Sequence, residues 1–209
     1  MDSDNKEEKV VEEVKLGLHK RVIKEAKNYL PFVLELAKIA VIAFIIVAPI
    51  RYFLFQPFIV SGASMAPNFA TGDYLIIDEI SYRLSTPQRG DVVVFDASFI
   101  KGYEGQRFIK RMIGLPGETV EIKNGKVDVV GVDGKKIDLN ENYLFPDLKT
   151  FGNMNLKLNA DQYFVLGDNR DYSYDSRMWG AVPAKYIIGK AALRIFPVNN
   201  MSQILRPAY

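Results

Sequence analysis

The segment RFIKRMI, residues 107–113, mixes β-branched, aromatic and charged residues over the length of one strand. Comparable segments lie along the chain: YLII at 74–77, DVVVF at 91–95, TVEI at 119–122, QYFVL at 162–166 and IIGKAALRIF at 187–196. Asn124-Gly125 and Asp133-Gly134 favour tight hairpin turns. Because no helical pattern separates these segments, we predict a mainly β domain, an antiparallel sandwich or barrel-like fold. The polar segment 141–159 is predicted to be a surface insertion.

An apolar segment precedes the predicted strands. Every residue from Ile39 to Ile50 is apolar, and the segment 30–55 as a whole approaches the ~20 residues needed to cross a bilayer as a helix. Lys38 and Arg51 can extend to the headgroups, where Glu35 is also expected. Helices inside small domains are seldom apolar on all sides, so a membrane span is favoured over a core helix or a cleaved signal peptide.

Basic residues gather before the apolar segment, which favours a cytoplasmic N-terminus. They are Lys15, Lys20, Arg21, Lys24 and Lys27. We therefore expect a cytoplasmic amphipathic segment at 1–29, one transmembrane helix at 30–55 and an extracytoplasmic domain at 56–209. The predicted location is the cell membrane, or the inner membrane where there are two.

The composition excludes several classes of function. The chain has 209 residues, a net charge of +2 and scattered basic residues, which disfavours nucleic-acid binding. It has no cysteine, so disulfides and thiolate chemistry are excluded. Its single histidine, His19, lies upstream of the apolar segment and is expected on the opposite side of the membrane from the domain. A Ser-His-Asp triad within one chain is therefore excluded.

The segment SGASMAP, residues 61–67, is a turn of small residues that carries a serine just after the apolar segment. A serine hydroxyl needs a base to act as a nucleophile, and here lysine is the remaining side chain suited to that role. Lys110 lies among apolar residues, where burial would lower its pKa. From the local sequence alone, a solvent-facing lysine beside Arg107 and Arg111 stays an open alternative.

A third polar segment, GDNRDYSYDSR, occupies residues 167–177. Short polar side chains at this density are typical of Asx-turn loops. The segment could also support a site, with a hydroxyl that holds the lysine amine and an Asp-Arg pair that fixes the loop. Metal binding by Asp168, Asp171 and Asp175 is disfavoured, since no histidine accompanies them and the spacing differs from that of a calcium loop.

Together these segments resemble bacterial type I signal peptidases, membrane-anchored Ser-Lys endopeptidases that remove signal peptides from exported preproteins. Four motifs occur in the family's order, and the resemblance extends from the apolar segment to about Phe196. They are the serine box at 61–67, an Arg-Gly-Asp strand at 89–95, the lysine box with its Gly-Leu-Pro-Gly turn at 107–117, and the Gly-Asp-Asn-Arg-Asp box at 167–177.

The resemblance assigns roles to individual residues. It implies that Ser64 is the nucleophile and Lys110 the general base. Ser173 is then expected to hydrogen-bond the lysine amine, while Asp175 and Arg177 form a structural ion pair.

The resemblance also implies how the reaction intermediate is held. The backbone N–H of Ser64 would form part of the oxyanion hole. Gly62 occupies the position where some members add a serine hydroxyl as a second donor. Asn68 and Phe108 stand where other members have threonine and tyrosine, and neither change removes a catalytic function.

The implied reaction is amide hydrolysis through an acyl-enzyme, with no metal or cofactor. The substrate would add as an extended strand to a sheet edge. Shallow pockets involving Met65 and Ile109 would select small residues at the first and third positions before the cut, an Ala-X-Ala pattern. The implied partners are preproteins, the lipid bilayer and the secretion machinery. Apolar residues near the site belong either to a membrane face or to the surface core: Phe53, Phe55, Pro57 and Phe58.

Two other functions are compatible with parts of this pattern. Self-cleaving repressors use related Ser-Lys chemistry, but the apolar segment and the absence of a DNA-binding helix pair argue against them. A membrane-anchored β-domain could bind signal sequences or assembly partners without catalysis, which Ser64 and Lys110 argue against. The eukaryotic and archaeal signal peptidases, with histidine in place of the lysine, are excluded by Lys110.

Overall fold

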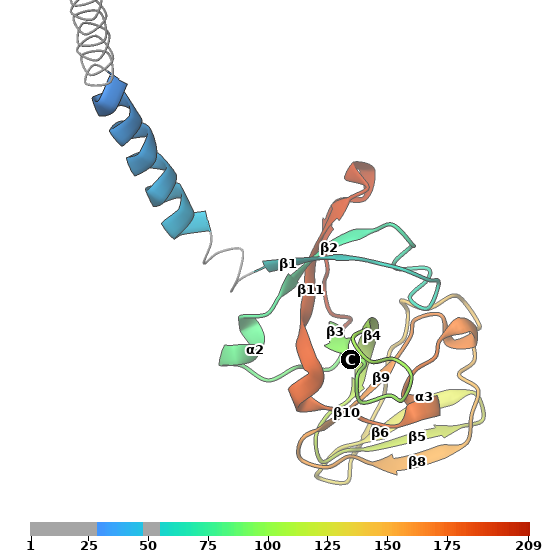
Figure 1. Ribbon diagram of the computed structural model, residues 1–209. Helices are drawn as coiled ribbons and strands as arrows, with labels where there is room; N and C mark the ends of the chain where they lie inside the picture. Colours follow the sequence, from blue (N-terminus) through green and yellow to red (C-terminus); the bar gives the residue numbers. More distant parts are fainter. Residues whose placement is uncertain (1–28, 48–54) are drawn as a thin grey trace, which may run out of the picture. The chain divides into compact units, whose positions relative to one another are not determined.

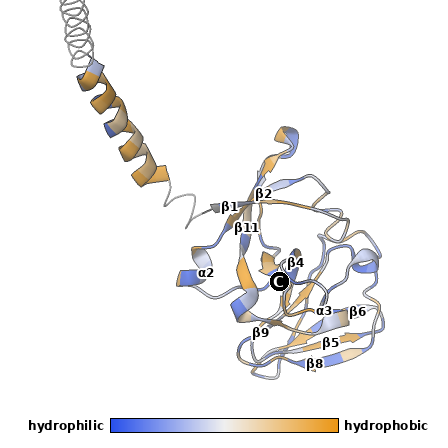
Figure 2. Cartoon of the chain, in the orientation of Figure 1, coloured by the Kyte–Doolittle hydropathy of each residue, from blue (hydrophilic) through white to orange (hydrophobic). Residues whose placement is uncertain are grey.

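The computed structural model describes residues 29–47 and 55–209, which belong to two compact units. The first unit contains the helix Tyr29–Val47 (Figure 1). Its 19 residues are mostly apolar (Figure 2) and extend over about 28 Å at the usual rise of an α-helix. It is the one helix among the described residues that is long and apolar enough to cross a membrane.

The described helix is shorter than the predicted span. It ends at Val47, residues 48–54 lie outside the described residues, and Phe55 is the first residue of a strand. The predicted cytoplasmic segment, including His19, also lies outside the described residues. The division of the chain at residues 29 and 55 therefore stays a prediction.

The second unit is built from two antiparallel sheets (Figure 1). The large sheet has the order β1 (Phe55–Ile59), β2 (Tyr74–Asp78), β11 (Ile187–Phe196), β3 (Val92–Asp96), β4 (Arg107–Gly114), β9 (Gln162–Leu166) and β10 (Val182–Pro183), with β12 (Ser202–Gln203) paired to β11. The small sheet has the order β7 (Lys136–Ile137), β6 (Lys126–Val130), β5 (Thr119–Lys123) and β8 (Met154–Lys157).

Short helical turns occur between strands of this unit. They are α2 (Ser81–Leu84), η1 (Arg170–Tyr172), α3 (Ser176–Trp179), η2 (Ala184–Tyr186) and η3 (Val198–Asn200). The predicted mainly β, antiparallel fold is confirmed, and the described strands do not close into a barrel because β1 and β10 are the ends of the large sheet.

The six strands predicted from sequence correspond to β2, β3, β4, β5, β9 and β11. The Asn124-Gly125 turn joins β5 to β6, with φ of 53° and 78° at its two residues. Positive φ at both central positions is what a type I′ hairpin turn requires, and asparagine and glycine tolerate it best. The predicted turn at Asp133-Gly134 lies between β6 and β7.

The segment 141–159 is more than the surface insertion that we predicted. Its strand β8 pairs with β5, and Met154 and Leu156 pack against the core of the small sheet. Thr150 and Leu158 are buried. The prediction was wrong here because four residues of alternating polarity are too short a pattern to stand out from the polar sequence around them.

The centre of the large sheet is apolar on both faces. Successive side chains of β3 point to opposite faces, so Val92 and Val94 pack in one core cluster while Val93 and Phe95 pack in another. Its neighbour β4 carries Lys110, which pairs in register with Val93. The lysine therefore extends from a strand that is fixed by packing on two sides.

Candidate active site

Ser64 and Lys110 meet at the surface of the second unit. Ser64 belongs to the turn that follows β1, and Lys110 lies 46 positions later in β4. Lys110 Nζ is 2.9 Å from Ser64 Oγ and donates a second hydrogen bond of 3.0 Å to the carbonyl oxygen of Ile109. The serine is half-buried, whereas Lys110 is 5% exposed. The solvent-facing alternative for this lysine is therefore excluded.

Burial changes the acidity of this lysine. Desolvation lowers the pKa of Lys110 to about 8, although the carboxylates of Asp175 and Asp168 act in the opposite direction. Loss of water disfavours the charged ammonium. At this pKa about one amine in ten is neutral at pH 7, compared with fewer than about one in a thousand for an ordinary lysine. The amine is thus able to accept a proton near neutral pH.

The two side chains lie in an open groove of about 320 Å³. One wall comes from β1 and the serine turn, and the other from the first half of β4. The residues that line it are Phe58, Ile59, Ser61, Gly62, Ala63, Ser64, Tyr103, Arg107, Phe108, Ile109, Lys110, Tyr172 and Tyr174. Among the described strands, β9 pairs with β4 only from Arg111 onward, so the edge of residues 107–110 is unpaired beside the groove.

Asn169, a residue that the sequence did not single out, holds the serine turn. Its backbone N–H donates to the carbonyl oxygen of Ser64 at 3.0 Å, and its side chain donates to that of Ala63 at 3.1 Å. On the other side of the turn, Gly62 exchanges hydrogen bonds with the Thr71 hydroxyl. Gly62 has φ of +92°, a conformation that favours glycine. The orientation of Ser64 is therefore fixed from both sides.

Gly167 lies between Ser64 and Ser173. A Cβ at this position would be 2.2 Å from Ser173 Oγ and 2.4 Å from the carbonyl oxygen of Ser64, so no larger residue fits. Ser173 Oγ is buried and has no hydrogen-bond partner among the described residues. The structure thus places this hydroxyl next to the serine turn, but the hydrogen bond to Lys110 that the resemblance implied is not formed in it.

Asp175 and Arg177 form an ion pair. Arg177 Nε and Nη2 lie 2.8 and 2.9 Å from the two carboxylate oxygens of Asp175, which is fully buried. The same carboxylate accepts a hydrogen bond from the N–H of Gly167. Arg177 also donates to the carbonyl oxygens of Arg170 and Ser173. The pair therefore holds the loop that carries Ser173 against the glycine beside Ser64.

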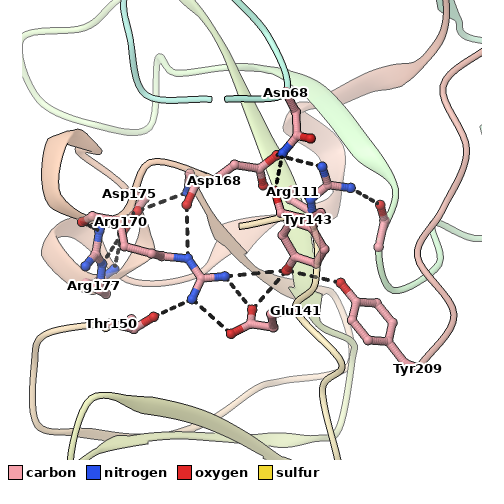
Figure 3. Close-up of polar contacts among 12 residues, drawn as sticks. Asn68, Arg111, Glu141, Tyr143, Thr150, Asp168, Arg170, Asp175, Arg177 and Tyr209 are labelled. Carbon is pink, nitrogen blue, oxygen red and sulfur yellow. Dashed lines mark hydrogen bonds and ion pairs between the residues drawn. The ribbon is translucent and has the colours of Figure 1, made fainter. Parts of the chain in front are cut away.

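A second ion pair links β4 to the same segment (Figure 3). Arg111, next to Lys110, donates from Nε and Nη2 to the carboxylate of Asp168 at 2.8 and 2.6 Å, and both side chains are buried. Asn68 donates to Asp168 at 2.8 Å and to the carbonyl oxygen of Tyr143 at 2.9 Å. Asn68 thus joins the serine turn to this pair.

The segment 141–159 completes the network in Figure 3. Glu141 forms an ion pair with Arg170, which also donates to the Thr150 hydroxyl. The Tyr143 ring lies 4.2 Å from the guanidinium of Arg111, and the Tyr143 hydroxyl accepts from that of Tyr209. Sequence patterns gave no sign of these contacts, because they join segments far apart in the chain.

The sequence of this chain is similar to that of a known family of proteins. A family model described as signal peptidase, peptidase S26, matches residues 33–196. The chain belongs to this family. Its members are peptidases, so this chain is a hydrolase.

Named relatives extend the match over most of the chain. The probable signal peptidase I-2 of Synechocystis is 44% identical, over 80% of this chain and 75% of the relative. Signal peptidase I T of Bacillus subtilis is 33% identical, over 93% of this chain and 99% of the relative. A crystal structure of a signal peptidase I from Enterococcus faecalis V583 is 30% identical, with a TM-score of 0.40, and covers 51% of this chain and 97% of that one.

Met65 and Ile109, which were expected to line substrate pockets in this S26 signal peptidase, differ in whether they reach the groove. Ile109 lines the groove, with 4% of its surface exposed. Met65 is fully buried and packs with Val60 and Phe69, so its side chain does not line the groove. The turn after Ser64 directs Met65 into the core, which the sequence alone could not distinguish from an orientation towards substrate.

The apolar residues before the serine turn also differ in position. Phe58 lines the groove and packs against the core cluster that contains Val92 and Val94, whereas Pro57 is exposed. Phe55 begins β1, and Phe53 lies outside the described residues. Within residues 29–47 and 55–209, no group of three or more His, Cys, Asp or Glu side chains is placed to hold a metal ion.

Proposed function

We propose that this S26 peptidase cleaves signal peptides from exported preproteins after small residues, with Ser64 as nucleophile and Lys110 as general base. The observation that carries the proposal is the 2.9 Å contact between Nζ of a buried lysine and Oγ of a serine in an open groove. Family membership and relatives named signal peptidase I support signal peptides as the substrate class.

The proposed reaction has two stages. Neutral Lys110 takes the proton of Ser64 Oγ as that oxygen attacks the scissile carbonyl carbon. The protonated amine then donates to the leaving nitrogen, the C–N bond breaks, and the mature protein departs from a Ser64 ester. In the second stage Lys110 takes a proton from water as the water oxygen attacks the ester carbon. The amine returns that proton to Ser64 Oγ as the C–O bond of the ester breaks, and the signal peptide leaves with a new carboxylate. In both stages Lys110 accepts the proton of the attacking group and passes it to the leaving group, so the amine is neutral again at the end of each stage.

The Ser64 backbone is suited to stabilise the negative oxygen formed at each stage. Its N–H donates no hydrogen bond among the described residues, and the carbonyl oxygens of Ala63 and Ser64 are held by Asn169. A fixed N–H directed at the developing charge is the usual element of an oxyanion hole. Gly62 has no side chain to add a second donor, so the proposal assigns this role to the Ser64 N–H alone.

The groove supports recognition of an extended peptide. The edge of β4 at residues 107–110 is unpaired beside it, and β1 is an end strand of the large sheet. A substrate strand between them would exchange backbone hydrogen bonds with such edges. Ile109 is almost covered where it lines the groove, so a pocket above it is shallow. We infer that small residues fit there, at the first and third positions before the cut.

The helix Tyr29–Val47 supports a membrane anchor, because its length is close to the ~30 Å of a bilayer core. With basic residues before it, we infer a single-pass protein of the cell membrane, or inner membrane, with a cytoplasmic N-terminus and an extracytoplasmic domain. The proposed partners are the bilayer, preproteins and the secretion machinery that delivers them.

The rate of cleavage should rise with pH between about 7 and 9. The neutral amine is the active base, and its fraction grows as pH passes through the Lys110 pKa of about 8. Measuring kcat/KM for a peptide substrate in detergent from pH 6 to 10 checks this. The expected profile gains almost tenfold per pH unit on its acidic side and levels off above the pKa. A profile that is flat from pH 6 to 9 would contradict the role of Lys110.

Peptides that differ only before the cut test the substrate proposal. Replacing alanine by leucine at the first or third position should lower kcat/KM by about 100-fold, because a shallow pocket has no room for the added carbons. The same replacement at the second position is the matched control and should change kcat/KM by less than about fivefold. Equal cleavage of all leucine peptides would reject small-residue selection.

A further inference from the structure

Three aromatic rings, those of Phe108, Tyr103 and Tyr174, contact one another in a row that begins at Lys110. This row is called the stack. Lys110 Nζ lies 5.5 Å from the centre of the Phe108 ring. Tyr103 contacts Phe108 edge-on with ring centres 5.2 Å apart, and Tyr174 stacks on Tyr103 at 5.4 Å with the two planes 27° apart. Aromatic pairs favour these geometries. All three rings line the groove that contains Ser64.

The stack joins the loop before β4 to the loop that carries Ser173. Tyr103 lies in the loop that leads into β4, the strand of Lys110. Tyr174 lies between Ser173, whose hydroxyl is buried beside Ser64, and Asp175, which is fixed by Arg177. The Ser173 hydroxyl has no hydrogen-bond partner among the described residues. The Tyr174 ring adds a contact with the loop before β4 to the ion pairs of Asp168 and Asp175 that hold this segment.

The amine of Lys110 is shielded from water although its groove is open. Lys110 lines an open groove, yet it is 5% exposed. Tyr103 is half-buried and Tyr174 is 40% exposed, so the stack has one face against the site and one towards solvent. A layer of aromatic rings in this position would keep water from the Lys110 amine and leave the groove open to a peptide substrate.

We infer that Tyr103 and Tyr174 are positioning residues for the cleavage reaction: their stack holds the Ser173 loop against the Lys110 strand and excludes water from the amine. The inference rests on the proposed Ser64-Lys110 mechanism. It concerns the rings rather than the hydroxyl groups, because the contacts that carry it are ring contacts.

The test compares Tyr103→Ala and Tyr174→Ala with Tyr103→Phe and Tyr174→Phe in the full-length protein. Each alanine variant should lower kcat about tenfold with KM changed by less than about twofold. The phenylalanine variants keep the rings and should stay within about threefold of wild type. The double alanine variant should lose little more than one single variant, because either change breaks the same stack.

The pH profile separates positioning from a loss of folding. With water admitted to the amine, the rise of kcat/KM should move to higher pH in both alanine variants. The charged groups that act on Lys110 are unchanged: they are Asp175 and Asp168 on the 167–177 segment. Arg111, the next residue of β4, stays paired with Asp168. Val93, opposite Lys110 on β3, is uncharged. A shift in the profile therefore reports solvent access.

Tyr74→Ala is the matched control, since it removes an aromatic pair outside the groove. Tyr74 contacts Phe196 edge-on at 5.6 Å, and neither lines the groove. This variant should keep kcat within about twofold. If Tyr103→Ala and Tyr174→Ala behave like Tyr74→Ala while Ser64→Ala is inactive, the inference fails and the proposed function stands. If Ser64→Ala cleaves as well as wild type, the proposed function itself fails.

Discussion

Replacing Lys110 with methionine is expected to lower kcat/KM for signal-peptide cleavage by about 10⁴-fold. Methionine keeps most of the apolar stem that packs in β4 but removes the amine 2.9 Å from Ser64 Oγ. The hydroxyl then has no proton acceptor, and the leaving nitrogen has no proton donor. The measurement is cleavage of a fluorogenic peptide by both proteins in the same detergent.

Lys157→Met is the matched control for this prediction. Lys157 also lies in a strand, β8, but it is exposed on the small sheet. Its replacement should leave kcat/KM within about twofold of wild type. If Lys110→Met retained more than about a tenth of wild-type activity while folding normally, another group would have to be the base.

Replacing Asp168 with asparagine is expected to destabilise the domain by about 3–5 kcal/mol. The amide has nearly the same shape but no charge, so Arg111 is left buried without its counter-ion. Arg111 cannot release its proton to escape this cost, since the guanidinium stays charged at any ordinary pH. In thermal unfolding followed by circular dichroism, the midpoint should fall by about 10 °C.

Asp133→Asn tests whether this loss depends on burial. Asp133 pairs with Lys135, and the two side chains are 57% and 84% exposed. Surface pairs of this kind contribute less than about 1 kcal/mol. The midpoint should therefore change by less than about 3 °C. Equal midpoints for Asp168→Asn and Asp133→Asn would show that the buried pair does not hold the domain together.

The parts of the fold that could be predicted are those with a strong local pattern. Residues 91–95 are a short, mostly apolar segment, and residues 107–113 mix β-branched and aromatic residues with charged ones over the length of one strand. The Asn124-Gly125 turn needs residues that tolerate positive φ. β1 was not separated from the apolar segment before it, because apolar residues continue on both sides of Arg51 as far as Phe55. β8 was missed because its alternation covers four residues.

Local sequence patterns predicted less of the candidate site than of the fold. Ser64 and Lys110 could be selected because chemistry excluded histidine and cysteine, and because four motifs occur in one family's order. Their contact depends on strands brought together by the sheet, which no local pattern encodes. Asn169, Asn68 and Glu141 act through contacts between segments far apart in the chain. Such roles become visible only once the strands are placed.

The most direct test of the central proposal is cleavage of a preprotein with an Ala-X-Ala site by the full-length, detergent-solubilised protein, beside Ser64→Ala. N-terminal sequencing of the product identifies the bond that is cut. We expect one cut, directly after the second alanine, by the wild-type protein and none by Ser64→Ala. Cleavage by Ser64→Ala at the wild-type rate, or no cleavage by a folded wild-type protein, would contradict the proposal.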